Sequence, residues 1–301
     1  RDWSSDVCSS DLLPSTGKTQ NSFKVYDLEL KRNLFALRNG SFRADWLPKT
    51  DRLSYQVNND DLTDVYVYDV KTGEERLVAS GLNKPGNINW SPNEDYFLFS
   101  KNVEAEKPGD LKRIFGNDDR IPNTRDRSYL CVFDLKTKLA RPLTAGAESA
   151  SLQDIKPDGS RILFSTSDMD YTVVPFSKQT LFELDLRTMK TDTIWKDKLY
   201  GGNCRYSPDG NQLLVSGGPE TFGSLGVNVS DDRIPNSYDR QLFLFDLKTR
   251  NAEALTRDFD PAVENAEWRK DGFVYLTAVE RDFVNLYRLD LKKRTFTKID
   301  V

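Results

Sequence analysis

The pattern of apolar and polar positions repeats five times along the chain. Each copy has a short apolar strand, a Pro-Asp-Gly-like turn, a second apolar strand and an aromatic-rich strand that ends in Asp. Proline fixes φ at the start of such a turn and Asp-Gly tolerates positive φ, so each turn predicts a chain reversal between two strands. The five turns begin at Pro48, Pro92, Pro157, Pro208 and Lys270.

An aspartate closes each aromatic-rich strand and opens a second tight turn, as in Asp69–Gly73 and Asp246–Arg250. We expect its carboxylate to accept backbone N–H groups of that turn, and a fourth strand to follow. No long stretch shows the apolar spacing of an amphipathic helix. The shortest intervals between these aspartates match the period of one four-stranded blade, so the sequence predicts an all-β fold, a β-propeller.

The repeats divide the chain into predicted blades. We expect five complete blades, at about 38–80, 81–145, 146–197, 198–256 and 257–301, preceded by the last two strands of another blade, near 23–27 and 34–37. On this interpretation the ring of blades is incomplete.

The first residues do not follow the repeat. Residues 2–12 look like the in-frame translation of a sequencing adapter. We therefore assign 1–12 to an artefact and 13–301 to the propeller. The alternative is a native polar loop.

Composition fits a protein with a sizeable core. The chain has 301 residues, 38% of them hydrophobic, and no apolar run approaches the ~18 residues of a membrane span. Its net charge of −4, with charges of both signs, gives no basic footprint for nucleic acid. Cys131 and Cys204 fall in strands of non-adjacent blades, and we interpret both as small core residues. The sequence does not decide the cellular compartment, and a periplasmic or a secreted location fits the composition.

The chain contains no histidine. A Ser-His-Asp or Cys-His system needs an imidazole to carry the proton, and most zinc sites need one as a ligand. The segment 222–226 resembles a nucleophile elbow, but Phe222 stands where Gly is required. The segment 15–19 resembles the end of a phosphate-binding loop, but Leu12 stands where its first Gly should be. We therefore expect no catalytic residue, no metal and no cofactor.

Two long insertions exceed what the blades require. Residues 118–127 and 231–240 are near copies, and both precede the third strand of their blade. Long loops of this kind often carry function, so they are candidates for a binding rim on one face. Alternatively, their Ile-Pro pairs pack on the neighbouring blade while Arg and Asp pair locally. The candidate binding residues are Arg120, Asn123, Asp126, Arg233, Asn236 and Asp239, and the two arginines have the fork geometry that suits a carboxylate.

Several of these segments together resemble one family. They are Trp-Ser-Pro-Asn at 90–93, Tyr-Ser-Pro-Asp-Gly at 206–210, Tyr-Asp-Val-Lys-Thr-Gly at 68–73 and the stretch from 217 to 247. Over residues 20–301 the chain resembles the N-terminal propeller of prolyl oligopeptidase-type (S9) serine peptidases, including dipeptidyl-peptidase-like members. The turn motifs are shared with the WD40-like repeats of TolB-like propellers.

The resemblance implies a propeller that caps a C-terminal α/β-hydrolase domain and limits the access of peptides. Its partners would be the peptide substrate and that hydrolase domain, which the chain does not include. The family's paired glutamates cannot be placed, because Glu74-Glu75 occurs in the wrong kind of loop. We thus predict a non-catalytic propeller of a serine peptidase. The alternatives are a TolB-like interaction scaffold and a propeller fused to a metal-dependent amidohydrolase.

Overall fold

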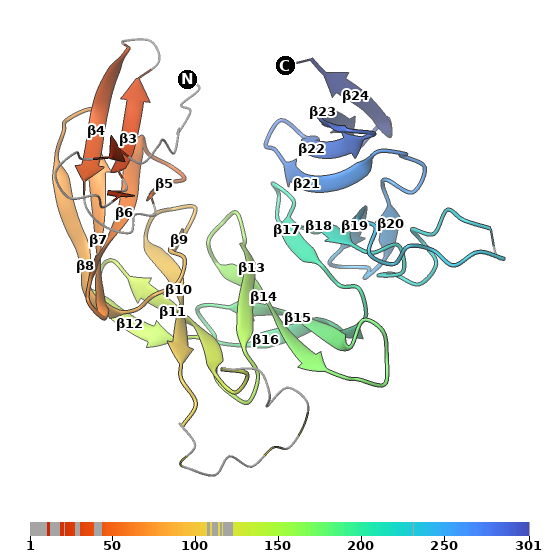
Figure 1. Cartoon of the computed structure of the whole chain (residues 1–301), viewed down its shortest axis with the longest axis horizontal. Coiled ribbons are helices and arrows are strands. Elements are labelled where there is room, and N and C mark those ends of the chain that lie inside the picture. The colour runs from red at the N-terminus through yellow and green to blue at the C-terminus, as the bar shows by residue number, and fades with distance from the viewer. Residues whose placement is uncertain are drawn as a thin grey trace. The chain divides into compact units, whose positions relative to one another are not determined.

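The computed structural model describes residues 11–12, 19–20, 22–27, 31–38, 44–106, 109, 114, 116, 123–230 and 232–300. Within these ranges the regular elements are all β-strands (Figure 1). The described residues include no helix long and apolar enough to cross a membrane. The chain divides into two compact units, one of residues 1–126 and 130–142 and the other of residues 127–129 and 143–301.

The first unit contains two four-stranded antiparallel sheets in which sequential strands are neighbours. Their strands are β5 (Ala44–Trp46), β6 (Arg52–Asn59), β7 (Leu62–Asp69) and β8 (Glu75–Asn83), then β9 (Asn89–Trp90), β10 (Tyr96–Val103), β11 (Arg127–Asp134) and β12 (Leu139–Pro142). Two strand pairs precede them, namely β1 (Asp11–Leu12) with β2 (Thr19–Gln20) and β3 (Ser22–Asp27) with β4 (Arg32–Arg38).

The second unit contains three sheets of the same construction. Their strands are β13 (Ala150–Ile155), β14 (Arg161–Met169), β15 (Ser177–Asp185) and β16 (Thr191–Lys198); β17 (Asn203–Tyr206), β18 (Gln212–Gly217), β19 (Gln241–Asp246) and β20 (Ala252–Ala254); and β21 (Ala262–Trp268), β22 (Phe273–Glu280), β23 (Phe283–Asp290) and β24 (Thr295–Ile299).

The five four-stranded sheets coincide with the five repeats, so the predicted fold class is confirmed. The two earlier strands expected near 23–27 and 34–37 are β3 and β4. Residues 1–10, including Cys8, lie outside the described residues, and the adapter interpretation of 2–12 stays a prediction. Cys131 and Cys204 are unpaired and buried, which confirms that both are core residues.

The aspartate at the end of each third strand caps the following turn as the sequence predicted. The Asp134 carboxylate accepts the backbone N–H groups of Thr137 at 2.7 Å and Lys136 at 2.9 Å. Hydrogen bonds of this kind to the charged form hold the pKa of the capping carboxyl below its ordinary value. The same arrangement recurs at Asp69, Asp185, Asp246 and Asp290.

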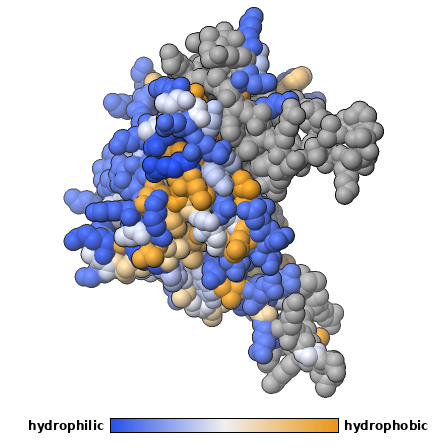
Figure 2. Space-filling model, turned by 90° about the vertical axis from the view of Figure 1, so that its left-hand side faces the viewer, coloured by the Kyte–Doolittle hydropathy of each residue, from blue (hydrophilic) through white to orange (hydrophobic). Residues whose placement is uncertain are grey.

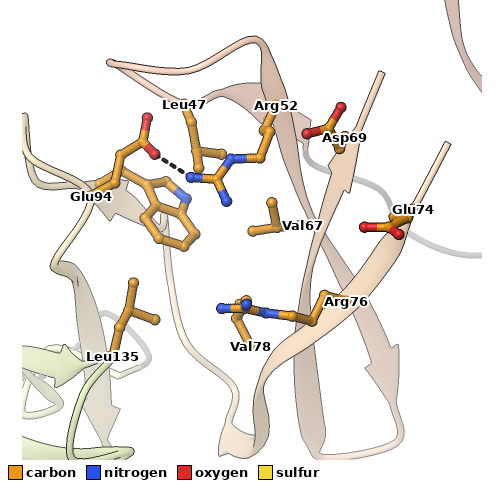
Figure 3. A pocket seen from close by; sticks show the side chains of 10 residues that line it. Leu47, Arg52, Val67, Asp69, Glu74, Arg76, Val78, Glu94 and Leu135 are labelled. Carbon is orange, nitrogen blue, oxygen red and sulfur yellow. Dashed lines mark hydrogen bonds and ion pairs between the residues drawn. The ribbon is translucent and has the colours of Figure 1, made fainter. Parts of the chain in front are cut away.

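A carboxylate links the first two sheets at their hairpin turns. Glu94 has φ 61°, at the turn position that Gly159, Gly210 and Gly272 occupy with positive φ in later repeats. Its side chain is only 5% exposed and reaches the β5–β6 turn. There it accepts the N–H groups of Lys49 and Thr50 at 2.8 and 2.7 Å and pairs with the Arg52 guanidinium at 2.6 Å (Figure 3).

A second link between neighbouring sheets comes from the last residue of the turn between the third and fourth strands. This residue is Lys138 or Arg250, and it also has positive φ. Lys138 donates to the Val78 carbonyl in the preceding sheet at 3.3 Å. In the second unit, Arg250 donates to the Ile194 carbonyl at 3.2 Å and pairs with Asp192 at 2.6 Å. Within each unit, the basic side chain of a left-handed turn residue thus bonds to the preceding sheet.

Candidate functional site

The long loop of the fourth repeat joins β18 to β19, and the structure describes all of it except Asp231. At the start of this loop, Gly217 and Gly218 allow other backbone segments to approach closely. A Cβ on Gly218 would lie 2.3 Å from the Ser237 carbonyl oxygen, so only glycine fits there. The Thr221 hydroxyl donates to the Tyr200 carbonyl at 2.7 Å, and the Gly218 N–H donates to the same oxygen at 3.1 Å. These contacts tie the loop to the β16–β17 connection.

Aromatic side chains anchor the base of this loop. Phe222 packs against Trp195, Phe243 and Phe245, with ring centroids 5.2 to 5.7 Å apart. The Lys198 ammonium lies 4.6 Å from the centre of the Phe222 ring and donates to the Thr221 carbonyl at 3.0 Å. Burial lowers the pKa of Lys198, because desolvation disfavours the charged ammonium. The base of the loop is therefore a packed platform.

The tip of the loop is exposed. Ile234 is 94% exposed and Tyr238 is 73% exposed, although Tyr238 meets Tyr200 edge to face at 5.9 Å. The side chain of Arg233 is exposed. Ile234 in this copy therefore does not pack on a neighbouring blade, whereas Pro235 is half-buried. The tip offers one guanidinium beside one aliphatic side chain.

Asn236 and Asp239 shape the turn that supports the tip. The Asn236 carbonyl accepts the Asp239 N–H at 2.9 Å, and its side-chain oxygen accepts the Tyr238 N–H at 3.3 Å. The neighbouring Ser237 hydroxyl donates to Glu220 at 2.6 Å. Asn236 thus organises the backbone, whereas Asp239 keeps an exposed side chain.

The second-repeat copy is only partly described, and Arg120 lies outside the described residues. Asn123 has φ 64°, and its carbonyl accepts the Asp126 N–H at 3.0 Å, the same turn bond as in the fourth repeat. The Asp126 carboxylate accepts the Ala105 N–H at 2.9 Å, so this side chain joins the two ends of the β10–β11 connection. Asn123 and Asp126 belong to the first unit and the other three described candidates to the second.

Sequence reasoning missed the residues beneath the fourth-repeat tip. Trp195, Lys198 and Tyr200 precede the loop by two strands, and no motif connects them to Phe222 or Tyr238. A Lys and a Tyr placed shortly before the Gly-Gly pair at 201–202 were the available signal. Only the packing of β16 beside this loop shows that these side chains form the packed platform at its base.

The chain contains serines but no histidine that could act as their general base. Ser224 is exposed in a turn, where its carbonyl accepts the Val227 N–H at 3.1 Å, and no helix follows it. Without a histidine anywhere in the chain, this serine has no imidazole base. The described His, Cys, Asp and Glu residues form no group of three or more that could hold a metal ion. A guanidinium beside an apolar side chain suits a ligand with a carboxylate.

No protein-family model and no curated protein matches the sequence. Solved structures do match the fold. The β-propeller domain of the trilobed protease from Pyrococcus furiosus superposes with a TM-score of 0.64 and 16% identity over 97% of this chain and 78% of that one. Acylaminoacyl peptidase from Pyrococcus horikoshii gives 0.65 and 17% over 94% of this chain and 42% of that one. TolB from Acinetobacter baumannii gives 0.54 and 14% over 92% and 59%.

This chain therefore spans less than half of the peptidase chain it resembles. At these identities the likeness shows the fold alone, and that fold serves proteins with different activities. The chain has a β-propeller fold similar to the propeller domains of S9-type peptidases and of TolB.

Proposed function

We propose that this chain is the propeller domain of a prolyl oligopeptidase-type serine peptidase, where it limits the access of peptides and docks a hydrolase domain. The observation that carries the proposal is the match to acylaminoacyl peptidase over 94% of this chain. The absence of histidine supports a non-catalytic role, because the proton-transferring residue of the reaction has to come from another domain. The resemblance of the 217–247 segment to the peptidase propellers points the same way.

The two long loops are the part of the chain that we assign to peptide contact. Arg233 and Arg120 would bind a carboxylate of the peptide through their guanidinium groups, with Asn236, Asp239, Asn123 and Asp126 shaping the two loops. In the fourth repeat, Phe222 packs on Trp195 and Lys198 at the base of the loop that carries Arg233. A peptide bound in this way is held without any chemical step on this chain.

The coding sequence downstream of codon 301 tests the proposal. A serine peptidase requires a G-x-S-x-G elbow between a strand and a helix, followed in order by an acidic residue and a histidine. An immediate stop codon, or a histidine-rich metal-binding domain, would contradict the proposal.

The loop assignment has its own test in the full gene product. Changing Arg120 and Arg233 together to Ala should raise KM for short peptides, leave kcat unchanged and leave the unfolding midpoint unchanged, because both interactions bind substrate and transition state equally. Arg187→Ala is the matched control, since Arg187 is an exposed arginine in the turn after β15. Unaltered KM with reduced stability would show that the loops serve packing.

A second candidate is an interaction scaffold of the TolB type. The likeness to TolB over 92% of this chain favours it, and exposed Ile234 and Tyr238 fit contact with a protein partner. The coding sequence downstream of codon 301 distinguishes the two candidate functions. A scaffold needs no elbow, acid or histidine after the propeller.

A further inference from the structure

A pocket of about 370 Å³ lies on one face of the sheet β13–β16, within the second unit. Its floor is formed by Phe164 and Phe182, whose rings stack with their centroids 5.0 Å apart. Its wall is the connection 143–149, which leads into β13. A cavity of roughly 150 Å³ accommodates benzene, so this pocket has room for an aromatic ring. None of its lining residues belongs to the two long loops described above.

Hydrogen bonds from residues of the same unit hold this wall in place. The Tyr129 hydroxyl donates to the Gly146 carbonyl at 2.7 Å, and the Ser128 N–H donates to the Ser149 hydroxyl oxygen at 3.1 Å. Three lining residues contribute only a methyl group, namely Ala145, Ala147 and Ala150. The wall is therefore fixed by its backbone, and its small side chains leave the space above the floor open.

The closing aspartates show which side chains correspond in the third and fifth sheets. Phe182 and Tyr287 each lie three residues before the closing aspartate of their sheet. On the outer strands, Thr191 and Phe296 each pair with the residue just before that aspartate. The two sheets can thus be compared position by position.

In the fifth sheet an aromatic ring occupies the place that corresponds to the pocket. The ring of Phe259, from the connection before β21, meets Tyr287 edge to face at 5.1 Å and stacks on Phe296 at 4.1 Å. The connection 143–149 begins with Leu-Thr like that connection, but it contains no aromatic residue, and Thr191 stands where Phe296 would stand. The third sheet therefore keeps an aromatic floor but lacks the two rings that fill the space above it.

The fourth sheet covers the same position with a different ring. Phe243 lies three residues before the closing Asp246, and Phe222 of the β18–β19 loop packs against it at 5.2 Å. In both later repeats of the second unit, a ring from outside the strands thus covers the residue that corresponds to Phe182.

The polar groups of the lining favour a ligand without negative charge. Among the described residues that line the pocket, none is basic, and the polar side chains are the carboxylate of Glu148 and the hydroxyls of Thr144, Thr166 and Thr191. Arg127 contacts the wall from outside the lining, and its Nε donates to the Ala147 carbonyl. Because Glu148 is exposed, its attraction for a cation is modest, and the aromatic floor has to supply most of the binding.

We propose that this pocket binds a small aromatic compound that is neutral or positively charged, with its ring on Phe182 in the place that Phe259 fills in the fifth repeat. Aromatic rings attract one another in offset-stacked and edge-to-face arrangements, which favours an aromatic ligand over an aliphatic one. The ring could belong to a free compound or to an aromatic side chain of a peptide, since both present the same group. The few contacts available suggest affinity in the roughly millimolar range.

The test is a ¹⁹F NMR titration of 4-fluorobenzylamine with the 301-residue chain. The probe resonance should shift and broaden in a saturable way, and 4-fluorobenzoate, which has a similar shape and the opposite charge, should bind about threefold more weakly. Benzyl alcohol should displace the probe, whereas butanol at the same concentration should not. Displacement by N-acetyl-phenylalaninamide as well shows that the site accepts peptide side chains, and displacement by benzyl alcohol alone limits it to free compounds.

Variants separate this site from nonspecific binding. Thr191→Phe should abolish binding, because it supplies the ring that Phe296 supplies in the fifth sheet. Thr297→Phe, the same change at an exposed position of β24, is the matched control and should bind the probe like the original chain.

A second pair of variants tests the charge and does not depend on the folding of Thr191→Phe. Glu148→Gln should reduce the preference for 4-fluorobenzylamine over 4-fluorobenzoate, and Asp258→Asn, at an exposed position before β21, should leave it unchanged. The proposal is overturned if 4-fluorobenzylamine does not bind, if butanol displaces it as well as benzyl alcohol does, if Thr191→Phe binds like Thr297→Phe, or if Glu148→Gln keeps the full preference.

Discussion

Glu94 gives the sharpest stability prediction, because one side chain joins two sheets. Its carboxylate accepts two backbone N–H groups, the Thr50 hydroxyl and the Arg52 guanidinium. Hydrogen bonds to charged groups contribute about 1.5–3 kcal/mol each, and the exposed Lys49 N–H can bond water instead. Glu94→Ala should therefore lower the free energy of unfolding by about 2–4 kcal/mol.

Glu94→Gly separates the carboxylate from the backbone. This variant loses the same hydrogen bonds, but glycine adopts φ 61° without the cost of about 1–2 kcal/mol that a left-handed residue carries. It should therefore be more stable than Glu94→Ala by about 1 kcal/mol. If the left-handed backbone at position 94 carried no cost, the two variants would have the same free energy of unfolding.

Glu94 also gives a pH dependence. Burial opposes its ionisation, but the hydrogen bonds from Lys49, Thr50 and Arg52 outweigh burial and hold its pKa below the ordinary value. A depressed folded-state pKa contributes stability above the unfolded-state pKa, and this contribution disappears as pH falls through the folded-state value. The stability difference between the original chain and Glu94→Gln should therefore shrink in acid.

Thermal and urea unfolding of these variants provide the measurement. A loss of about 2 kcal/mol corresponds to a decrease in Tm of about 3 °C in a chain of 301 residues. Glu104→Ala, at an exposed position in the same unit, is the matched control. The reasoning is refuted if Glu94→Ala unfolds with the control, or if Glu94→Gly is less stable than Glu94→Ala.

Three further predictions follow from single residues. Tyr206→Phe should lower the free energy of unfolding by about 1–3 kcal/mol in urea, because it leaves the buried Glu183 short of a donor, and Tyr275→Phe, with an exposed hydroxyl, should have a much smaller effect. Gly202→Ala should cost at least about 3 kcal/mol, or prevent folding, since its methyl group would lie 1.6 Å from the Ser216 carbonyl oxygen; Gly109→Ala, which meets open space, should be tolerated. The chain by itself should not react with a fluorophosphonate probe, because no histidine can activate Ser224, and stoichiometric labelling of Ser224 in mass spectrometry would disprove this.

Exposed apolar side chains also occur in the first unit. Figure 2 shows apolar side chains gathered in the middle of one face, with hydrophilic ones around them. The exposed apolar residues of this unit include Leu62 and Leu77, which are about half exposed at 49% and 47%.

The sequence determined the features that depend on near neighbours. Turn chemistry at Pro157-Asp158-Gly159 and its counterparts located the hairpins, and the closing aspartates located the third strands, because both act within a few residues along the chain. The count of five sheets followed from these signals. The missing histidine excluded catalytic triads without any structure.

The tertiary structure decided which side chains meet across sheets. Glu94 reaches Thr50 over 44 residues and Tyr206 reaches Glu183 over 23, and neither pair has a sequence signature. The position of Lys198 beneath the loop of the fourth repeat is likewise visible only after packing. The physical reason is that a strand's pattern shows which faces are buried, whereas the partner on each face depends on the register and twist of two different sheets.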